Sequence, residues 1–146
     1  MRNLSRDVRR AAGVFFLRAL LGMVIFLQGY VKIFSWGLGA VYDNIFKPLE
    51  AAAIPLGVLQ AMTFVSSYTE LVGGLMLLLG LLRQYVYLLL GGLLLLLAFG
   101  QGLLSPAWEM DRLYFTGSML AALLLLPAHW DTWCLDRFTG SNGQEE

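Results

Sequence analysis

The sequence predicts an all-α integral membrane protein, a bundle of four transmembrane helices. Hydrophobic residues make up 58% of the 146 residues and charged residues 14%, whereas a soluble domain is roughly 25% charged. The apolar residues lie in long blocks, which a small core in water has no room for and a lipid bilayer accommodates. The blocks show no alternation of period two, so helices rather than β-strands are expected to satisfy the backbone in lipid.

Four apolar blocks define the predicted spans, at residues 12–34, 58–82, 85–104 and 113–127. The first three reach the roughly 20 residues that cross a ~30 Å hydrocarbon core; the shorter fourth would begin a turn earlier or cross a thinner region. Together they form a transmembrane domain, 12–128, between a basic tail at 1–11 and a partly disordered polar tail at 129–146. The first block is longer than a signal-peptide core and lacks a small-residue cleavage site, so we expect it to be retained.

The connectors between the blocks differ in kind. Only Arg83 and Gln84 separate the second block from the third, which predicts a tight hairpin, and a short polar loop with a proline follows the third. The first connector, 35–57, is long and places apolar residues at positions 42, 45, 46 and 49. This i, i+3, i+4, i+7 spacing predicts a short amphipathic helix in the membrane interface, which ends or bends at Pro48.

The distribution of basic residues predicts the orientation. The side that holds both tails and the second connector is richer in arginine than the opposite side, which puts the N and C termini in the cytoplasm. The four tryptophans fall at the two interfaces, as amphipathic rings do in membrane proteins. The residues concerned are Arg2, Arg6, Arg9, Arg10, Arg83, Arg137, Trp130 and Trp133 on the cytoplasmic side, and Lys32, Lys47, Arg112, Trp36 and Trp108 on the other.

Charged residues inside the predicted spans are candidates for function, because placing a charge in lipid costs a few kcal/mol or more. A helix rotates by ~100° per residue, which brings Arg18 and Lys32 to one face of the first predicted helix. Gly22 and Gly29 lie between them on the same face. Small residues at these positions let a neighbouring helix come close.

The second predicted helix carries the complementary charge. Glu70 lies near its middle and is followed by Gly73 and Gly74, so a carboxylate sits on a face of small residues. We expect this face to pack against the first helix, with Glu70 paired either to Arg18 or to Lys32. The antiparallel course of the two helices and the long basic side chains allow both partners.

Two interpretations of this charged group remain open. In one, an ion pair fixes the register of the bundle and performs no chemistry. In the other, a polar pocket binds a lipid headgroup or a quinone ring, or passes protons through Glu70. Additional polar side chains that could line such a pocket are Gln28, Tyr30, Gln101, Tyr114 and Ser118.

Several site types are not expected. The zero net charge indicates no nucleic-acid partner. Cys134 is the only cysteine, so an intrachain disulfide or a CxxC redox pair is excluded. His129 is the only histidine, which argues against haem ligation within the chain. The sequence shows no phosphate-binding loop, no Ser-His-Asp set and no metal-ligand spacing, and we expect no catalytic residues, no metal and no covalently bound cofactor.

Two runs resemble the DoxX family of small four-helix membrane proteins. The run 18–34 contains an arginine followed by a glycine and a lysine spaced G-x-x-K, which is similar to the family's first-helix pattern. The run 69–83 is similar to its second-helix signature, E-x-x-G-G-x-x-L-x-x-G followed by a basic residue. The residues that match are Arg18, Lys32, Glu70 and Arg83, whereas Gln28 stands where family members often have a histidine. The resemblance covers the chain from about residue 13 to 127.

The resemblance implies a multi-pass protein of the bacterial cytoplasmic (inner) membrane. The family is named for a small subunit of a quinone-reducing thiosulfate oxidoreductase, and relatives are associated with membrane redox and oxidative-stress systems. We therefore expect a polar pocket of Arg18, Lys32, Glu70 and Gln28 that binds a quinone or a phospholipid headgroup.

Three functions are compatible with these features. The first is an accessory subunit of a quinone-linked redox or respiratory system, which binds quinone or anchors a partner oxidoreductase and is not catalytic alone. The second is a purely structural or assembly subunit of a larger membrane complex. The third is a small-molecule or lipid transporter that acts as an oligomer. The expected partners are membrane lipids and either other membrane subunits or further copies of the chain.

Overall fold

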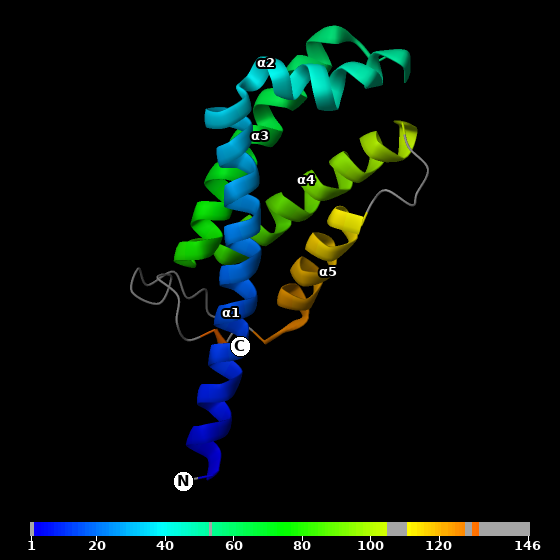
Figure 1. The fold of residues 1–146 in the computed structure, drawn as a ribbon. Helices are drawn as coiled ribbons and strands as arrows, with labels where there is room; N and C mark the ends of the chain where they lie inside the picture. The colour runs from blue at the N-terminus through cyan, green and yellow to red at the C-terminus, as the bar shows by residue number, and fades with distance from the viewer. Residues whose placement is uncertain (1, 53, 105–110, 128–129, 132–146) are drawn as a thin grey trace.

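The computed structural model describes residues 2–52, 54–104, 111–127 and 130–131, and it is helical almost throughout (Figure 1). Within these residues there is no β-strand, and three helices are long and apolar enough to cross a membrane: Asp7–Trp36, Leu56–Leu79 and Arg83–Gly100. The all-helical class is therefore confirmed, and the first three predicted blocks correspond to three candidate membrane spans. The predictions for Trp108, His129, Trp133, Cys134 and Arg137 lie outside the described residues.

The elements follow the predicted blocks closely. The first block forms α1 and continues as a π-helix, the first connector forms three short helical segments, and the other blocks form one helix each. In chain order they are α1 (Arg2–Tyr30), η1 (Val31–Trp36), α2 (Leu38–Val41), η2 (Tyr42–Phe46), η3 (Lys47–Ala52), α3 (Leu56–Leu79), α4 (Arg83–Leu104) and α5 (Asp111–Leu125). Residues 2–11, which the sequence assigns to a basic tail, thus continue α1 without a break.

The turn between α3 and α4 lies earlier than predicted. Arg83 and Gln84 are the first residues of α4, and the turn is formed by residues 80–82. Gly80 adopts the left-handed conformation (φ 68°) and caps α3, with its N–H donating to the Leu77 carbonyl and that of Leu81 to the Met76 carbonyl. Glycine is favoured there because it has no Cβ, so Gly80, not the polar pair, ends the helix.

Helices α1 and α3 form the closest pair in the molecule and run side by side (Figure 1). A Cβ atom at Gly29 would collide with the backbone of Leu71, and one at Gly74 with the backbone of Phe26. These glycines therefore permit backbone contact between the two helices, as the sequence predicts. Gly73 faces a different neighbour, since a Cβ there would lie 3.0 Å from Leu90 of α4.

The connector between α1 and α3 folds over one end of the bundle. Its apolar side packs inward: Phe46 and Leu49 are buried in a cluster with Val41 and with Leu59 of α3. The helical path changes at Lys47, one residue before Pro48, in agreement with the predicted bend. On the outer side, Tyr42 donates a hydrogen bond to Glu50, which raises the pKa of Tyr42 to about 12.

Helices α4 and α5 complete the bundle. A second apolar cluster joins α1, α3, α4 and α5 through residues such as Leu21, Leu77, Leu90 and Leu120. Towards the end covered by the connector, α4 leans away from α1 (Figure 1). The bundle is therefore most tightly packed on the α1–α3 side.

Candidate functional site

An ion pair between Lys32 and Glu70 lies between α1 and α3. The Lys32 Nζ atom donates to Glu70 Oε1 at 2.6 Å, and the exposed fractions of the two side chains are 14% and 5%. The sequence left Arg18 and Lys32 as alternative partners, and the structure places Lys32 at the carboxylate. A charged pair in so apolar a setting is held by its own mutual attraction, since no bulk water screens it.

The local sequence explains how the pair is positioned. Gly29 and Gly74 bring the two backbones into contact one turn away from Lys32 and Glu70 respectively. Lys32 is the second residue of the π-helix η1, where α1 changes its winding. π-Helical turns are rare in proteins, and many of those that exist lie at functional sites.

Glu70 retains one oxygen outside the ion pair. Its Oε2 atom is buried and has no hydrogen-bond partner among the described residues. A buried carboxylate oxygen is a strong acceptor, and leaving it without a donor costs free energy. Glu70 therefore keeps an unsatisfied buried acceptor next to the ion pair.

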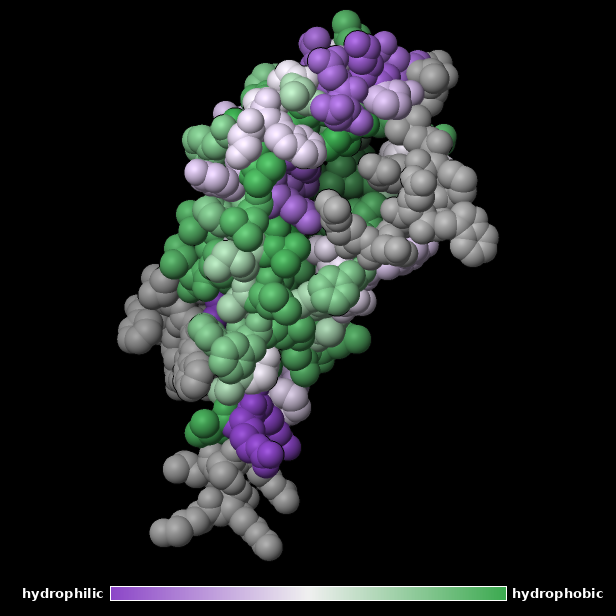
Figure 2. Space-filling view, viewed as in Figure 1, coloured by the Kyte–Doolittle hydropathy of each residue, from purple (hydrophilic) through white to green (hydrophobic). Residues whose placement is uncertain are grey.

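A cavity of about 580 Å³ adjoins the ion pair. Figure 2 shows a hollow beneath the connector, with hydrophobic surface behind it and hydrophilic atoms at its edge. The cavity lies between α1 and α4 and is closed at one end by η1 and η2. Its polar lining is Gln28, Lys32, Glu70 and Thr116, and its apolar lining is Ile25, Leu27, Val31, Trp36, Ile45, Leu90, Leu93, Leu94, Leu97 and Leu113.

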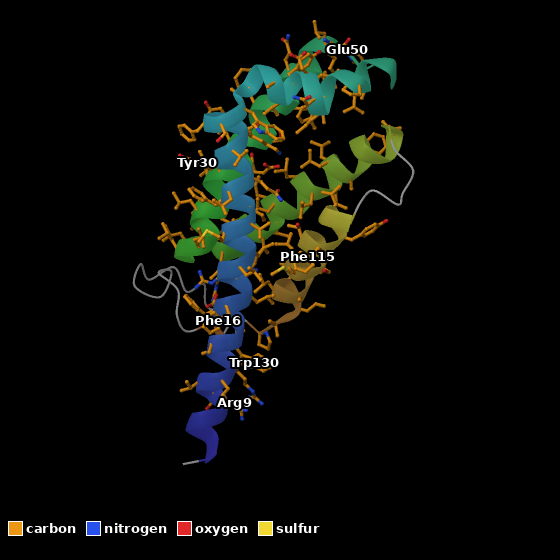
Figure 3. The ribbon with its side chains drawn as sticks, in the orientation of Figure 1. Arg9, Phe16, Tyr30, Glu50, Phe115 and Trp130 are labelled. Atoms are coloured by element: carbon orange, nitrogen blue, oxygen red, sulfur yellow. The ribbon has the colours of Figure 1, made fainter. Side chains whose placement is uncertain are left out.

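Of the additional polar residues that the sequence suggested, Gln28 lines this cavity. Tyr30 instead points outward, is 45% exposed and lies against Phe34, with ring centres 4.9 Å apart (Figure 3). Tyr114 is 63% exposed, and the Ser118 hydroxyl donates to the Phe115 carbonyl. The suggestion that these three line the pocket is therefore wrong, because their helices turn them towards the lipid-facing side; the side chain of Gln101 lies outside the described set.

Arg18, near the middle of α1, belongs to a second charged cluster, beside the turn between α3 and α4. Its Nη1 atom donates to the Leu77 carbonyl at 2.8 Å, and its Nε lies 3.1 Å from Asp131 Oδ2. Arg83, at the start of α4, approaches the same carboxylate oxygen at 3.3 Å. The Arg18 side chain is 1% exposed, so this is a buried three-residue cluster that joins α1, the end of α3 and the start of α4.

Comparison of the sequence with known protein families gives one match. The family model of DoxX matches residues 13–102, a segment that holds both Lys32 and Glu70. The chain belongs to the DoxX family. No curated protein and no solved structure matches the chain.

The site residues of this DoxX-family chain thus separate into two groups. Lys32, Glu70 and Gln28 meet at the cavity, whereas Arg18 lies 14 positions from Lys32 along α1, about 20 Å at the rise of a helix. The single pocket of all four residues that we expected from the sequence is not formed. The reason is that the carbonyls at the end of α3 and the Asp131 carboxylate hold the Arg18 guanidinium.

Asp131 is the charged residue that the sequence reasoning missed. It follows the fourth predicted span and lies beyond the residues that the DoxX model matches. Its neighbour Trp130 lies beside α1, with the Arg10 guanidinium 4.9 Å from its ring centre (Figure 3). Its position in the sequence could have identified it as a partner for the arginines. It is an aspartate next to an interfacial tryptophan, at the end of the bundle that holds Arg18 and Arg83.

Proposed function

We propose that the chain is a membrane subunit accessory to a quinone-linked redox system, and that the cavity beside Lys32 and Glu70 binds the head of a quinone-type molecule. The observation that carries this proposal is a largely buried ion pair on the wall of a largely apolar cavity. Pockets of a few hundred Å³ with apolar walls and a few convergent polar groups are typical of small-molecule sites.

The lining suits an amphiphile with a small polar ring. The Lys32 ammonium and the Gln28 amide supply donors for oxygen atoms on the ring. The leucines of α4, among them Leu93 and Leu97, supply an apolar wall for a prenyl tail. The cavity is lined by residues of the candidate spans, such as Gln28 and Leu97, so such a molecule would reach it from the bilayer.

The proposal assigns electron transfer to a partner. With a single cysteine, Cys134, and a single histidine, His129, the sequence offers no redox pair and no haem-ligand pair of its own. The chain would therefore bind the quinone, or anchor an oxidoreductase beside it, while the partner supplies or removes electrons.

The placement in the membrane is part of the proposal. All four apolar helices cross the bacterial cytoplasmic membrane, and both termini face the cytoplasm. Helix α5 has 15 residues, a length of about 22 Å, so the bilayer is thinned beside it. Lys32 and Glu70 then lie towards the outer leaflet, and Arg18, Arg83 and Asp131 near the cytoplasmic one.

Gentle detergent extraction from native membranes, followed by mass spectrometry of co-purifying lipids and proteins, tests this function. We expect a quinone and a redox enzyme with the wild-type chain, and depletion of the quinone from the Glu70→Gln variant. A Tyr30→Phe variant, which removes a hydroxyl outside the cavity, should retain the quinone. Purified protein that carries phospholipid alone and no redox partner would count against the proposal.

A structural role in a larger complex is the second candidate. It is favoured by the two charged clusters, each of which joins separate helices: Lys32 with Glu70, and Arg18 with Asp131 and Arg83. Buried ion pairs can serve to fix a unique register. Under this alternative, deletion of the chain removes an assembly, and Glu70→Gln changes that assembly without changing any bound quinone.

A further inference from the structure

We propose that Gln28 holds the ring of the bound molecule, and that the cavity therefore accepts the quinone and the hydroquinone with similar affinity. This inference rests on the proposed function, and it names the residue that binds the ring and the redox selectivity of that same site. It follows from the position of Gln28 in the cavity wall and from the state of its amide.

Gln28 belongs to a row of side chains on the α1 side of the cavity. Ile25, Gln28 and Lys32 all line the cavity, and their spacing of three and four residues places them on one face of the helix. The described lining residues of α4, on the opposite wall, are Leu90, Leu93, Leu94 and Leu97. A ring that lies between these walls therefore meets Gln28 on one side and leucine side chains on the other.

The amide of Gln28 differs from the other polar groups of the lining. Gln28 is half-buried and has no hydrogen-bond partner in the described part of the chain, yet neither of its amide atoms is fully buried. In Glu70, by contrast, Oε1 is bound by Lys32 at 2.6 Å and Oε2 is buried. The Thr116 side chain is buried as well. Among the described lining residues, Gln28 is thus the polar group that a ligand reaches without displacing a contact within the protein.

A primary amide can bind both redox forms of the ring. Its NH2 group donates to the carbonyl oxygen of a quinone, and its oxygen accepts from the hydroxyl group of a hydroquinone. Rotation of the amide exchanges its oxygen and nitrogen, so neither form leaves an unsatisfied polar group against Gln28. A site of this kind does not trap one form, which suits a subunit that passes a quinone between the bilayer and a partner enzyme.

Binding of a matched redox pair tests the inference. The full-length protein in nanodiscs is titrated under argon with decylubiquinone and, separately, with decylubiquinol, and heats of binding give the two dissociation constants. We expect the two Kd values to agree within about threefold, and both to rise by about tenfold in Gln28→Met, which removes one hydrogen bond and keeps the length of the side chain. Gln84→Met, the same change at an exposed position at the start of α4, should alter neither Kd.

The unfolding midpoint of the ligand-free protein separates binding from a structural role. Because Gln28 has no hydrogen-bond partner in the described part of the chain, Gln28→Met should unfold at the wild-type temperature. Should Gln28→Met not fold, Gln28→Asn takes its place with the same expectation, since it keeps the amide and withdraws it by one methylene group.

The outcomes separate this inference from the function on which it rests. Similar wild-type Kd values that both rise when the Gln28 amide is removed support the inference. A wild-type preference of tenfold or more for either form, or unchanged binding by the folded Gln28 variant, overturns the inference and leaves the proposed quinone site standing. Binding of neither compound by the wild-type protein overturns the proposed function, and the inference with it.

Discussion

Lys32 and Glu70 place opposite charges in the apolar interior of the bundle, and each charge is stable there because of the other. Glu70→Ala strands the Lys32 ammonium, so we expect a loss of about 3 kcal/mol in the free energy of unfolding. Leu79→Ala, on the same helix at a side chain that is 43% exposed, should cost much less. Thermal unfolding of both variants in the same detergent measures the difference, and equal midpoints would show that Glu70 is not held in a dry pair.

Asp131 holds two guanidinium groups with one carboxylate oxygen. Asp131→Asn removes the negative charge between Arg18 and Arg83, and we expect a loss of roughly 3 kcal/mol in unfolding free energy. Asp7→Asn is the matched control, because the Asp7 side chain is 70% exposed and its contact to Arg10 is 3.9 Å; exposed pairs contribute little. Should the two variants unfold at the same temperature, the buried cluster would be dispensable.

The sequence identified three of the charged residues of the interior but not all of their partners. Arg18, Lys32 and Glu70 stand out because charges are rare inside apolar spans. Which of the two cations meets Glu70 depends on the carbonyls of Leu77 and Leu78 and on Asp131, which are distant in sequence. A pattern confined to two helices does not include Asp131 and does not show which backbone carbonyls a side chain reaches.

At the scale of elements, the contact between α1 and α3 depends on glycine. Gly74→Ala would drive a methyl group into the backbone of Phe26, so the helices must separate, at a cost of about 1–3 kcal/mol. Gly92→Ala on α4 meets nothing within 4 Å and should leave stability unchanged or slightly raised, because alanine is the better helix former.

Unfolding midpoints of these two glycine variants check the role of the glycine face. A Gly74→Ala protein as stable as Gly92→Ala would contradict the close approach of α1 and α3. The Lys32–Glu70 pair lies next to that contact, so Gly74→Ala should weaken quinone binding as well as lower the unfolding midpoint.

The elements were largely predictable and their ends less so. Long apolar blocks placed the ends of α3, α4 and α5 to within a few residues, since hydropathy reflects a whole span, whereas α1 begins ten residues before its predicted span. The turn at 80–82 was misplaced because a polar pair, Arg83 and Gln84, looks like a connector, whereas the left-handed Gly80 is what stops α3. The course of α4 and α5 could not be predicted, because their leucines surround each helix and favour no single face.

At the scale of the whole molecule, the proposed orientation is testable with single cysteines. Cys134 is the only native cysteine, and the excess of arginine at that end predicts that it faces the cytoplasm. A membrane-impermeant maleimide should label it in inverted vesicles and not in intact spheroplasts. Gly57→Cys in a Cys134→Ser background, at an exposed position near the start of α3, should give the opposite result, and the reverse pattern would invert the topology.

The proposed quinone site is the cavity beside Lys32 and Glu70. The most direct measurement is photolabelling of the protein in nanodiscs with an azido-quinone, followed by peptide mapping by mass spectrometry, with a photoreactive phospholipid as control. We expect quinone label on cavity residues such as Gln28, Trp36 and Leu97, competed by unlabelled quinone, and no label on them from the phospholipid. Label spread over lipid-facing residues such as Phe16 and Tyr85, without competition, would contradict it.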